Sequence, residues 1–191
     1  MENPMSTAQK PAPASSITQW RVDPAHTRAE FAVKHLMVTT VRGHFGDVDG
    51  TVREDSADPT RSSIEVSFKV ASLNTGVDQR DAHLRSPDFF DVEQFPSLTF
   101  RSTRIVPAGD DKLQVTGDLT IKGVTKSVVL DVTEEGRGGD PWGGQRAGFS
   151  ATAKIDRRDF GLNYNQALET GGWVVGHEVK INLDIELIRQ D

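Results

Sequence analysis

The stretch "KLQVTGDLTIK" (Lys112–Lys122) has the most regular pattern in this chain, because apolar and polar residues alternate along its whole length. Successive side chains of a β-strand point to opposite faces, so a period of two predicts a strand with one buried and one solvated face. A polar or charged outer face is typical of an antiparallel sheet that is wet on one side. The residues expected to point inward are Leu113, Val115, Gly117, Leu119 and Ile121.

The same alternation recurs on both sides of this segment. A short start at 19–24 and the segment 41–54, whose alternation slips near Gly46 and indicates a bulge, bring the number to about eight strands. The chain offers no amphipathic helix long enough to cover the apolar face, so the sheet has to close into a barrel or fold into a sandwich. The other inward positions are Ala29, Phe31, Val33, His35, Ile64, Val66, Phe68, Val70, Leu98, Phe100, Val128, Leu130, Val132, Phe149, Ala151, Ala153, Ile155, His177, Val179, Ile181, Leu183, Ile185 and Leu187.

The segment "RDAHLRSPDFFDVEQFP" (Arg80–Pro96) breaks the strand pattern. We expect a short helical insert near residues 78–91, with Asp78 capping a helix that ends at Arg85 and Ser86 capping a second turn. The insert is either a catalytic element around His83 or a lid over the space that the strands enclose. Its apolar side chains are too few for an independent core and must pack on the sheet, which favours the lid; they are Leu84, Phe89, Phe90 and Phe95.

The inside of an eight-stranded barrel is either filled by side chains or holds one small or slender ligand. Small residues at the inward positions Ala29, Gly117, Ala151 and Ala153 favour a hollow barrel, because a packed core has reason to use larger residues there. The alternative is that these small residues complement large neighbours across a solid core.

Composition excludes several classes of protein. The chain has 22 Lys and Arg against 28 Asp and Glu, with the basic residues scattered, so nucleic acid is not an expected partner. Cysteine is absent, which removes disulfides, thiolate nucleophiles and sulfur-ligated metals. No apolar run approaches the length that spans a bilayer, so we expect no stable membrane insertion.

Length suits one domain, which we place at 18–191 after a disordered tail at 1–17. The tail lacks the basic and apolar regions of a secretory signal, so we expect a cytoplasmic protein. The alternative is a mature chain from which a signal has been removed.

The histidines do not form a metal or catalytic pattern. His26, His35 and His44 follow one another at intervals of nine residues. A metal site would need His35 opposite His44 in a hairpin at Thr39-Thr40, but this turn lacks the residues that such a hairpin favours. We therefore predict no metal, no cofactor and no catalytic residue. His35 and His177 fall on the inward face, where each needs a polar partner. We expect that partner to be a neighbouring side chain or a water molecule near the rim, and contact with a ligand or catalysis through one of them are the alternatives.

Three local features carry weaker expectations. His83 lies beside Asp81 and Arg85, whose spacing allows a surface ion pair on a short helix. The glycine-rich segment 134–146 is expected to be a flexible hairpin loop rather than a phosphate-binding loop. Residues 163–176 are expected to form a rim loop anchored by its apolar side chains Tyr164, Leu168 and Trp173.

The residues quoted so far are similar to a known family. The segments 22–50, 80–103, 115–132 and 156–164 resemble the YceI-like family in order, with "RDAHLRSPDFF" and "GDLTIKGVTK" as the most specific motifs. The resemblance implies a lipocalin-like antiparallel barrel of eight strands with an internal apolar channel that binds long isoprenoid chains. It implies no catalytic residues. Many members carry a secretion signal, which this sequence lacks.

We therefore predict a non-enzymatic protein that binds a long isoprenoid or related lipid, of polyprenyl or isoprenoid quinone type, for transport, storage or sequestration. The alternatives are a barrel enzyme acting through His35 or His177, and a solid-core protein with a protein partner. Exposed rim strands also allow a homodimer. The predicted lid consists of Leu84, Phe89 and Phe90; the predicted ligand-binding residues are Phe31, Val33, His35, Phe68, Phe100, Leu119, Leu130, Phe149, Ile181, Leu183 and His177.

Overall fold

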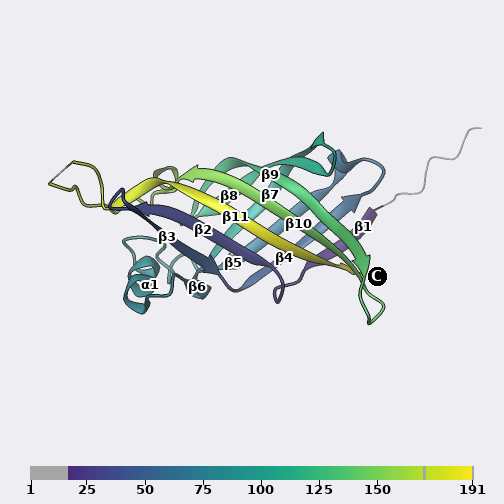
Figure 1. Cartoon of the computed structure of the whole chain (residues 1–191), viewed down its shortest axis with the longest axis horizontal. Coiled ribbons are helices and arrows are strands. Elements are labelled where there is room, and N and C mark those ends of the chain that lie inside the picture. The colour runs from purple at the N-terminus through teal and green to yellow at the C-terminus, as the bar shows by residue number, and fades with distance from the viewer. Residues whose placement is uncertain (1–16, 170, 191) are drawn as a thin grey trace, which may run out of the picture.

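Hydrogen bonds between the first and last strands close the sheet of this protein into a barrel (Figure 1). The computed structural model describes residues 17–169 and 171–190. Within them the strands are β1 (Ile17–Val22), β2 (Arg28–His35), β3 (Thr39–Phe45), β4 (Val48–Asp55), β5 (Ser63–Lys69), β6 (Leu73–Asn74), β7 (Ser97–Gly109), β8 (Lys112–Ile121), β9 (Val124–Gly139), β10 (Gln145–Asp156) and β11 (Val175–Gln190). The ring runs β1–β4–β5–β7–β8–β9–β10–β11 and back to β1, all antiparallel, which confirms the predicted eight-stranded barrel.

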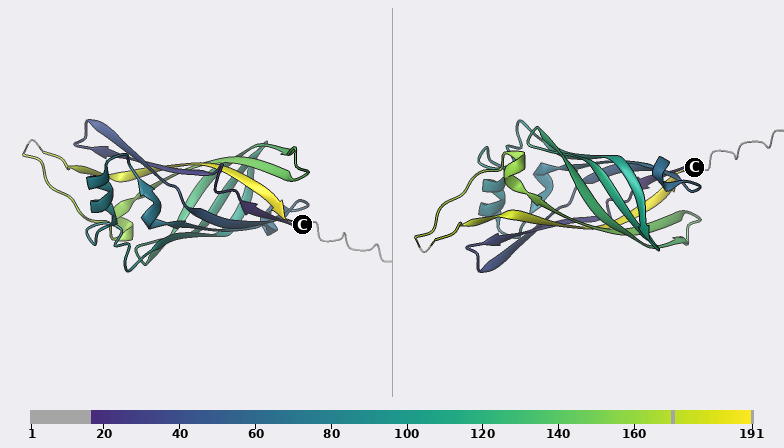
Figure 2. Two further views of the ribbon diagram at one scale, coloured as in Figure 1. Left: turned by 90° about the horizontal axis from the view of Figure 1, so that it is seen from below. Right: turned by 90° about the horizontal axis from the view of Figure 1, so that it is seen from above.

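One edge of β11 pairs with two different strands along its length. β1 pairs with the last residues of β11, whereas β2 pairs with the same edge of β11 from Val175 to Asp184. The β2–β3 hairpin therefore extends the wall at one end of the barrel, and β6 adds two residues to its outer edge. Both views of Figure 2 show this hairpin at the end where the helix lies.

Helix α1 (Asp78–Arg85) lies at that end and confirms the predicted helical insert (Figure 1). The predicted cap is wrong, because Val77 occupies the capping position without a side-chain hydrogen bond and Asp78 is the first helical residue. The predicted ion pair between Asp81 and Arg85 is also wrong. Asp81 is buried and accepts hydrogen bonds from Thr75, while Arg85 donates to a backbone carbonyl.

Two expectations about strand boundaries need correction. The chain does not bulge at Gly46 but leaves one partner strand for another, since β3 pairs with β2 whereas β4 pairs with β1 and β5. The segment 134–146 is mostly strand, because β9 runs to Gly139 and β10 starts at Gln145. Only five residues form the loop there, so the pairing of β9 with β10 continues through most of this glycine-rich segment.

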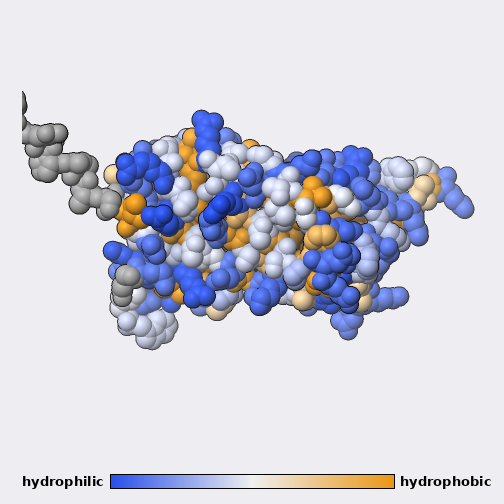
Figure 3. All heavy atoms as spheres, turned by 180° about the vertical axis from the view of Figure 1, so that it is seen from behind, coloured by the Kyte–Doolittle hydropathy of each residue, from blue (hydrophilic) through white to orange (hydrophobic). Residues whose placement is uncertain are grey.

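His35 does not lie opposite His44, as expected from the lack of turn residues at Thr39-Thr40. The turn comes earlier than Thr39-Thr40, so His35 lies opposite Thr39 and His44 lies opposite Glu30. The predicted tail at 1–17 lies outside the described residues except for Ile17, which is the first residue of β1. No helix of the described residues is long and apolar enough to cross a membrane. The face seen from behind is mostly hydrophilic, with hydrophobic residues in narrow stretches (Figure 3).

A close approach inside the wall explains one of the small inward residues. A Cβ atom at Gly117 would lie 2.3 Å from Cζ of Phe100 and 2.6 Å from the carbonyl oxygen of Arg101. The Phe100 ring therefore fills the place of a side chain at Gly117, as the packing alternative for the small residues expects. Ala29 and Ala151 instead line open space in the interior.

Replacing Gly117 with alanine is expected to destabilise the barrel by about 1–3 kcal/mol, because the added methyl group forces the Phe100 ring and the neighbouring backbone to shift. Chemical denaturation of both proteins measures the difference. The matched control is Gly138→Ala in β9, where a Cβ meets nothing within 4 Å. An equal effect of the two substitutions would contradict the packing explanation.

Candidate functional site

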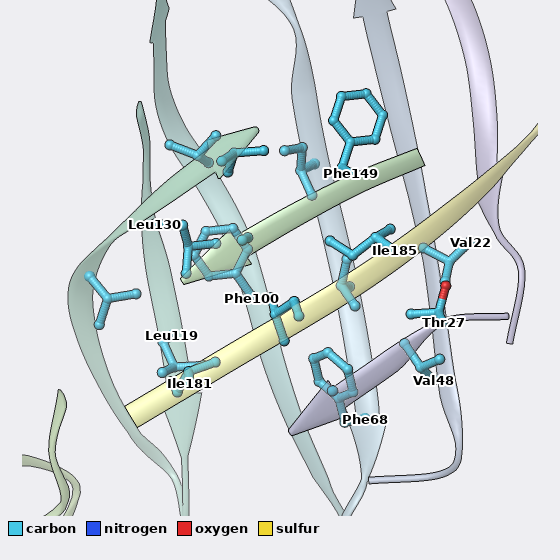
Figure 4. A pocket seen from close by; sticks show the side chains of 18 of the residues that line it. Val22, Thr27, Val48, Phe68, Phe100, Leu119, Leu130, Phe149, Ile181 and Ile185 are labelled. Atoms are coloured by element: carbon cyan, nitrogen blue, oxygen red, sulfur yellow. The ribbon is translucent and has the colours of Figure 1, made fainter. Parts of the chain in front are cut away.

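An apolar cavity of about 640 Å³ occupies the inside of the barrel. Figure 4 shows the side chains of Phe68, Phe100, Leu130, Phe149 and Ile181, from five different strands, pointing into one common space. The volume falls in the range of roughly 300–1,000 Å³ that is typical of small-molecule sites. The barrel is therefore hollow, which contradicts the solid-core alternative.

Most of the predicted ligand-binding residues share this wall, as the alternation of their strands requires. The three lid residues close part of the same space, with Phe89 buried and Leu84 and Phe90 half-buried. That these side chains contact a ligand stays a prediction. The predicted residues that line the cavity are Phe31, Val33, Phe68, Phe100, Leu119, Leu130, Phe149, Ile181, Leu183, Leu84, Phe89 and Phe90.

The two histidines predicted to point inward lie outside the cavity wall formed by the described residues. The pairing of β11 with β2 shifts register between Val175 and Val179, so the inward alternation is interrupted where His177 lies. The His177 ring packs 5.8 Å from the ring of Trp173. His35 is the last residue of β2, at the rim. This correction leaves the catalytic alternative without an imidazole at the cavity.

Charged side chains gather at the mouth of the cavity that is remote from α1. Arg137 in β9 donates from both terminal nitrogens to the Glu54 carboxylate, at 2.9 and 2.7 Å. It also donates to Glu134 from Nε at 2.5 Å and from Nη2 at 2.9 Å, and the indole of Trp20 donates to Glu54 at 2.8 Å. We call Trp20, Glu54, Glu134 and Arg137 the mouth cluster; all four residues line the cavity.

The mouth cluster also shifts the ionisation of its members. The hydrogen bonds from Arg137 hold the pKa of Glu54 below its usual value, against the opposing effect of burial. Glu134 and Glu54 in turn raise the pKa of Arg137. The guanidinium lies 5.6 Å from the centre of the Trp20 ring, within range of a cation–π contact. Sequence reasoning missed this cluster because Glu134 and Arg137 lie in the glycine-rich segment interpreted as a loop.

Comparison with known proteins now defines the family. The model of the YceI-like domain matches residues 20–187. The chain belongs to the YceI-like family. It is 36% identical over 188 residues to a UPF0312 protein of Pseudomonas putida, covering 97% of this chain and 94% of the relative.

Solved structures share the barrel. The crystal structure of BcnA from Burkholderia cenocepacia superposes with a TM-score of 0.76 at 28% identity, covering 86% of this chain and 98% of that one. A structure described as a polyisoprenoid binding domain from Saccharophagus degradans superposes with a TM-score of 0.63 at 15% identity, covering 91% of this chain and 98% of that one. The second likeness shows the fold alone.

In this YceI-like barrel, a buried carboxylate anchors the lid helix. Asp81 is only 4% exposed, and its carboxylate accepts hydrogen bonds from the backbone N–H of Thr75 at 3.0 and 3.1 Å and from its hydroxyl at 2.5 Å. Arg80 donates to the Thr75 hydroxyl at 2.7 Å and to its carbonyl at 2.8 Å. These bonds join the first turn of α1 to the strand end at β6.

The lid also contacts the rim loop and the β8–β9 turn. The His83 ring stands at 86° to both Phe89 and Tyr164, at 5.1 and 4.8 Å between centres, and its Nε2 lies 2.9 Å from Asp88. Lys122 in the turn donates to the Pro87 carbonyl at 2.7 Å. His83 therefore joins the helical insert to Tyr164 of the rim loop, and these contacts include no serine, threonine or cysteine.

One group of side chains has metal-ligand chemistry. One ligand atom each of Asp23, His26 and Glu186 lie within 4.8 Å of one another. Arg146 Nη1 donates to both carboxylates, at 2.7 Å to Asp23 and 2.5 Å to Glu186, so a cation already occupies the position between them. Hydrogen bonding to Asp23 raises the pKa of His26, which favours its protonated form over a metal ligand. The group is best explained as an ion-pair network.

The mouth cluster is expected to make stability depend on pH. Because the folded pKa of Glu54 lies below its ordinary value of 4.5, the contribution of Glu54 is complete above that value and is lost as the pH falls through the folded pKa. Unfolding free energies measured by urea denaturation from about pH 6 to about pH 3 should therefore fall more steeply for the native protein than for Glu54→Gln. Parallel curves would contradict this assignment.

Removal of the lid anchor is expected to weaken the fold. The substitution Asp81→Ala leaves the N–H and hydroxyl of Thr75 without their acceptor and should cost about 1–3 kcal/mol in urea denaturation. The matched control is Asp78→Ala in the same helix, an exposed carboxylate whose loss should cost no more than about 0.5–1 kcal/mol. If the control were the more damaging change, Asp81 would not be the anchor.

Proposed function

We propose that this protein binds an extended apolar molecule, an isoprenoid or a related lipid, inside the barrel and does not transform it chemically. The observation that carries the proposal is the apolar cavity of about 640 Å³ within a closed sheet. The side chains leave this apolar cavity unfilled, and a ligand with an apolar chain would fill it.

The energetics of burial support an apolar ligand. Each buried CH₂ group contributes roughly 0.8 kcal/mol, so one five-carbon isoprene unit contributes about 3–4 kcal/mol before ordering costs. Association and immobilisation of the chain cost about 4–15 kcal/mol, which a few buried units outweigh. A chain that is long and narrow suits a space walled by strands on all sides.

The comparisons support the same class of ligand at the level of the fold. The Saccharophagus degradans domain is described as polyisoprenoid-binding. Its structural similarity to this chain extends to the barrel, but at 15% identity it does not extend to the ligand. The polyprenyl or quinone type of the ligand, a role in transport, storage or sequestration, and a cytoplasmic location therefore stay predictions. The absence of histidine from the cavity wall of the described residues favours binding over catalysis.

Filling the cavity tests the proposal. Ala151 in β10 is 2% exposed and lines the cavity, so Ala151→Phe places a ring in the space where the ligand would lie. The experiment extracts purified protein with organic solvent and quantifies the carried lipid by mass spectrometry per mole of protein. We expect the native protein to carry an isoprenoid or similar lipid, and the variant to carry at least about tenfold less, the equivalent of about 1.4 kcal/mol.

The matched control is Thr152→Phe, the next residue along the strand, which is exposed on the outer face. It should keep the ligand of the native protein. Circular dichroism of both variants separates blocked binding from unfolding, since overpacking alone costs about 1–3 kcal/mol. A native protein that carries no apolar molecule after expression, and takes up none from added isoprenoids, would overturn the proposal.

A further inference from the structure

Four apolar side chains project from the barrel at the end where α1 lies. Three of them form the turn between β2 and β3, and the fourth lies in the loop before β11. The two segments are joined, because the backbone N–H of Leu36 donates to the Val174 carbonyl at 2.8 Å. We call these residues the apolar tip; they are Leu36, Met37, Val38 and Trp173, exposed by 39%, 56%, 75% and 46%.

The backbone of the tip holds its side chains outward at a cost. Leu36 and Met37 both have left-handed φ angles, 51° and 62°. Hairpin turns with two successive left-handed residues favour Asn and Gly, because a branched or long side chain is strained there. A turn that only had to reverse the chain would be more stable with those residues. The apolar residues at this position therefore point to a contact outside the barrel.

Basic residues lie on the outer face directly behind the tip. Lys180 of β11 and Arg42 of β3 both pair with Ala32, so they flank this small side chain on the same face, and Lys34 lies one outward position nearer the tip. Lys180 also lies directly opposite Lys154, an unfavourable pairing of like charges. Lys154 pairs with Glu178, whereas Lys34, Arg42 and Lys180 form no ion pair within the described part of the chain.

This basic group stands out in an acidic protein. The whole chain has a formal net charge of −6, yet Lys34, Arg42 and Lys180, which have no ion-pair partner among residues 17–169 and 171–190, lie close together on the outer face around Ala32. We call these three residues the basic row. Apolar side chains that project beyond a group of basic residues are the usual arrangement of a protein that rests on an anionic lipid surface.

We propose that the apolar tip and the basic row dock this protein on the surface of an anionic bilayer. The inference rests on the proposed function, because a protein that carries an apolar molecule must collect it from, or deliver it to, a lipid phase. The tip lies at the same end as α1, whose Leu84 lines the cavity, so docking brings the lid end of the cavity to the bilayer (Figures 1 and 2). A second copy is disfavoured as the partner, since two tips in contact would bring two basic rows together.

Vesicle co-sedimentation tests the proposal on the full chain. One set of vesicles is phosphatidylcholine alone, and the other contains about 30% phosphatidylglycerol, which supplies the negative surface charge. We expect binding to the anionic vesicles that weakens with added salt, and binding at least tenfold weaker to the neutral vesicles. The double substitution Met37→Asp and Val38→Asp should reduce binding at least tenfold, and each of Lys34→Gln, Arg42→Gln and Lys180→Gln about fivefold.

Tryptophan fluorescence identifies the end of the barrel that docks. Trp142 in the β9–β10 loop is 84% exposed at the opposite end and provides the matched control. The Trp142→Phe protein keeps Trp173 and the buried Trp20, of which only Trp173 is exposed to a docked bilayer. Anionic vesicles should therefore shift the emission of Trp173 to shorter wavelength, and binding should equal that of the native protein. Loss of binding in Trp142→Phe together with full binding of the tip variant would assign docking to the other end and overturn the proposal.

The remaining outcomes are also decisive. Equal binding to both kinds of vesicle, or none to either, overturns docking on an anionic bilayer. A dimer in solution that the tip substitutions dissociate assigns the tip to a second copy and overturns it too. Solvent extraction separates this inference from the proposed function: lipid carried without vesicle binding defeats only the docking inference, whereas vesicle binding without any carried lipid defeats the cavity proposal.

Discussion

The hydrogen bonds between β1 and β11 are the constraint on which the rest of the structure depends. An antiparallel sheet with one apolar face, accompanied in the described residues by a single short α-helix and short 3-10 turns, has no second layer to cover that face. Pairing the first strand with the last turns the apolar face inward and leaves no free edge in the ring. The mainly polar outer face then follows without any further element, because most inward residues have polar neighbours along their strand.

Closure produces an interior but does not decide whether it is filled. The aromatic rings decide that locally. The Phe100 ring lies over Gly117, and the Phe31 ring lies where a Cβ of Gly43 would be, so both rings pack closely against the wall while they line the cavity. Small residues inside this barrel therefore have two roles, making room for large neighbours and leaving space for a cavity. Glycines under the rings let aromatic side chains fold back, and alanines such as Ala151 leave the centre open.

The two ends of the barrel have different chemistry. At one end, Arg137 is held between two carboxylates beside Trp20, so the mouth is polar and its charges are neutralised in part within the cluster. At the other end, Leu84, Phe89 and Phe90 line the cavity, and helix α1, which carries Leu84, is joined to the end of β6 through the buried carboxylate of Asp81. An apolar molecule in this cavity would therefore have a charged mouth at one end and an apolar wall at the other. The projecting apolar tip lies at the end where these apolar side chains close the cavity (Figures 1 and 2).

Alternation of side chains determined the strands, their inward faces and the helical insert from the sequence alone, because the two-residue period of a strand is a local property. Thus Phe68, Leu119 and Ile181 were correctly placed on the cavity wall. Only the tertiary structure decided that the chain changes partner strands at Gly46. It also decided where the register of β11 shifts, which removes His177 from the interior, and that Glu54 contacts Arg137, 83 residues away in the sequence. Each of these depends on pairing between distant strands, and a register shift or a long-range ion pair leaves no period in the sequence. The size of the cavity belongs to the same class, since it depends on how rings from different strands turn toward or away from the axis.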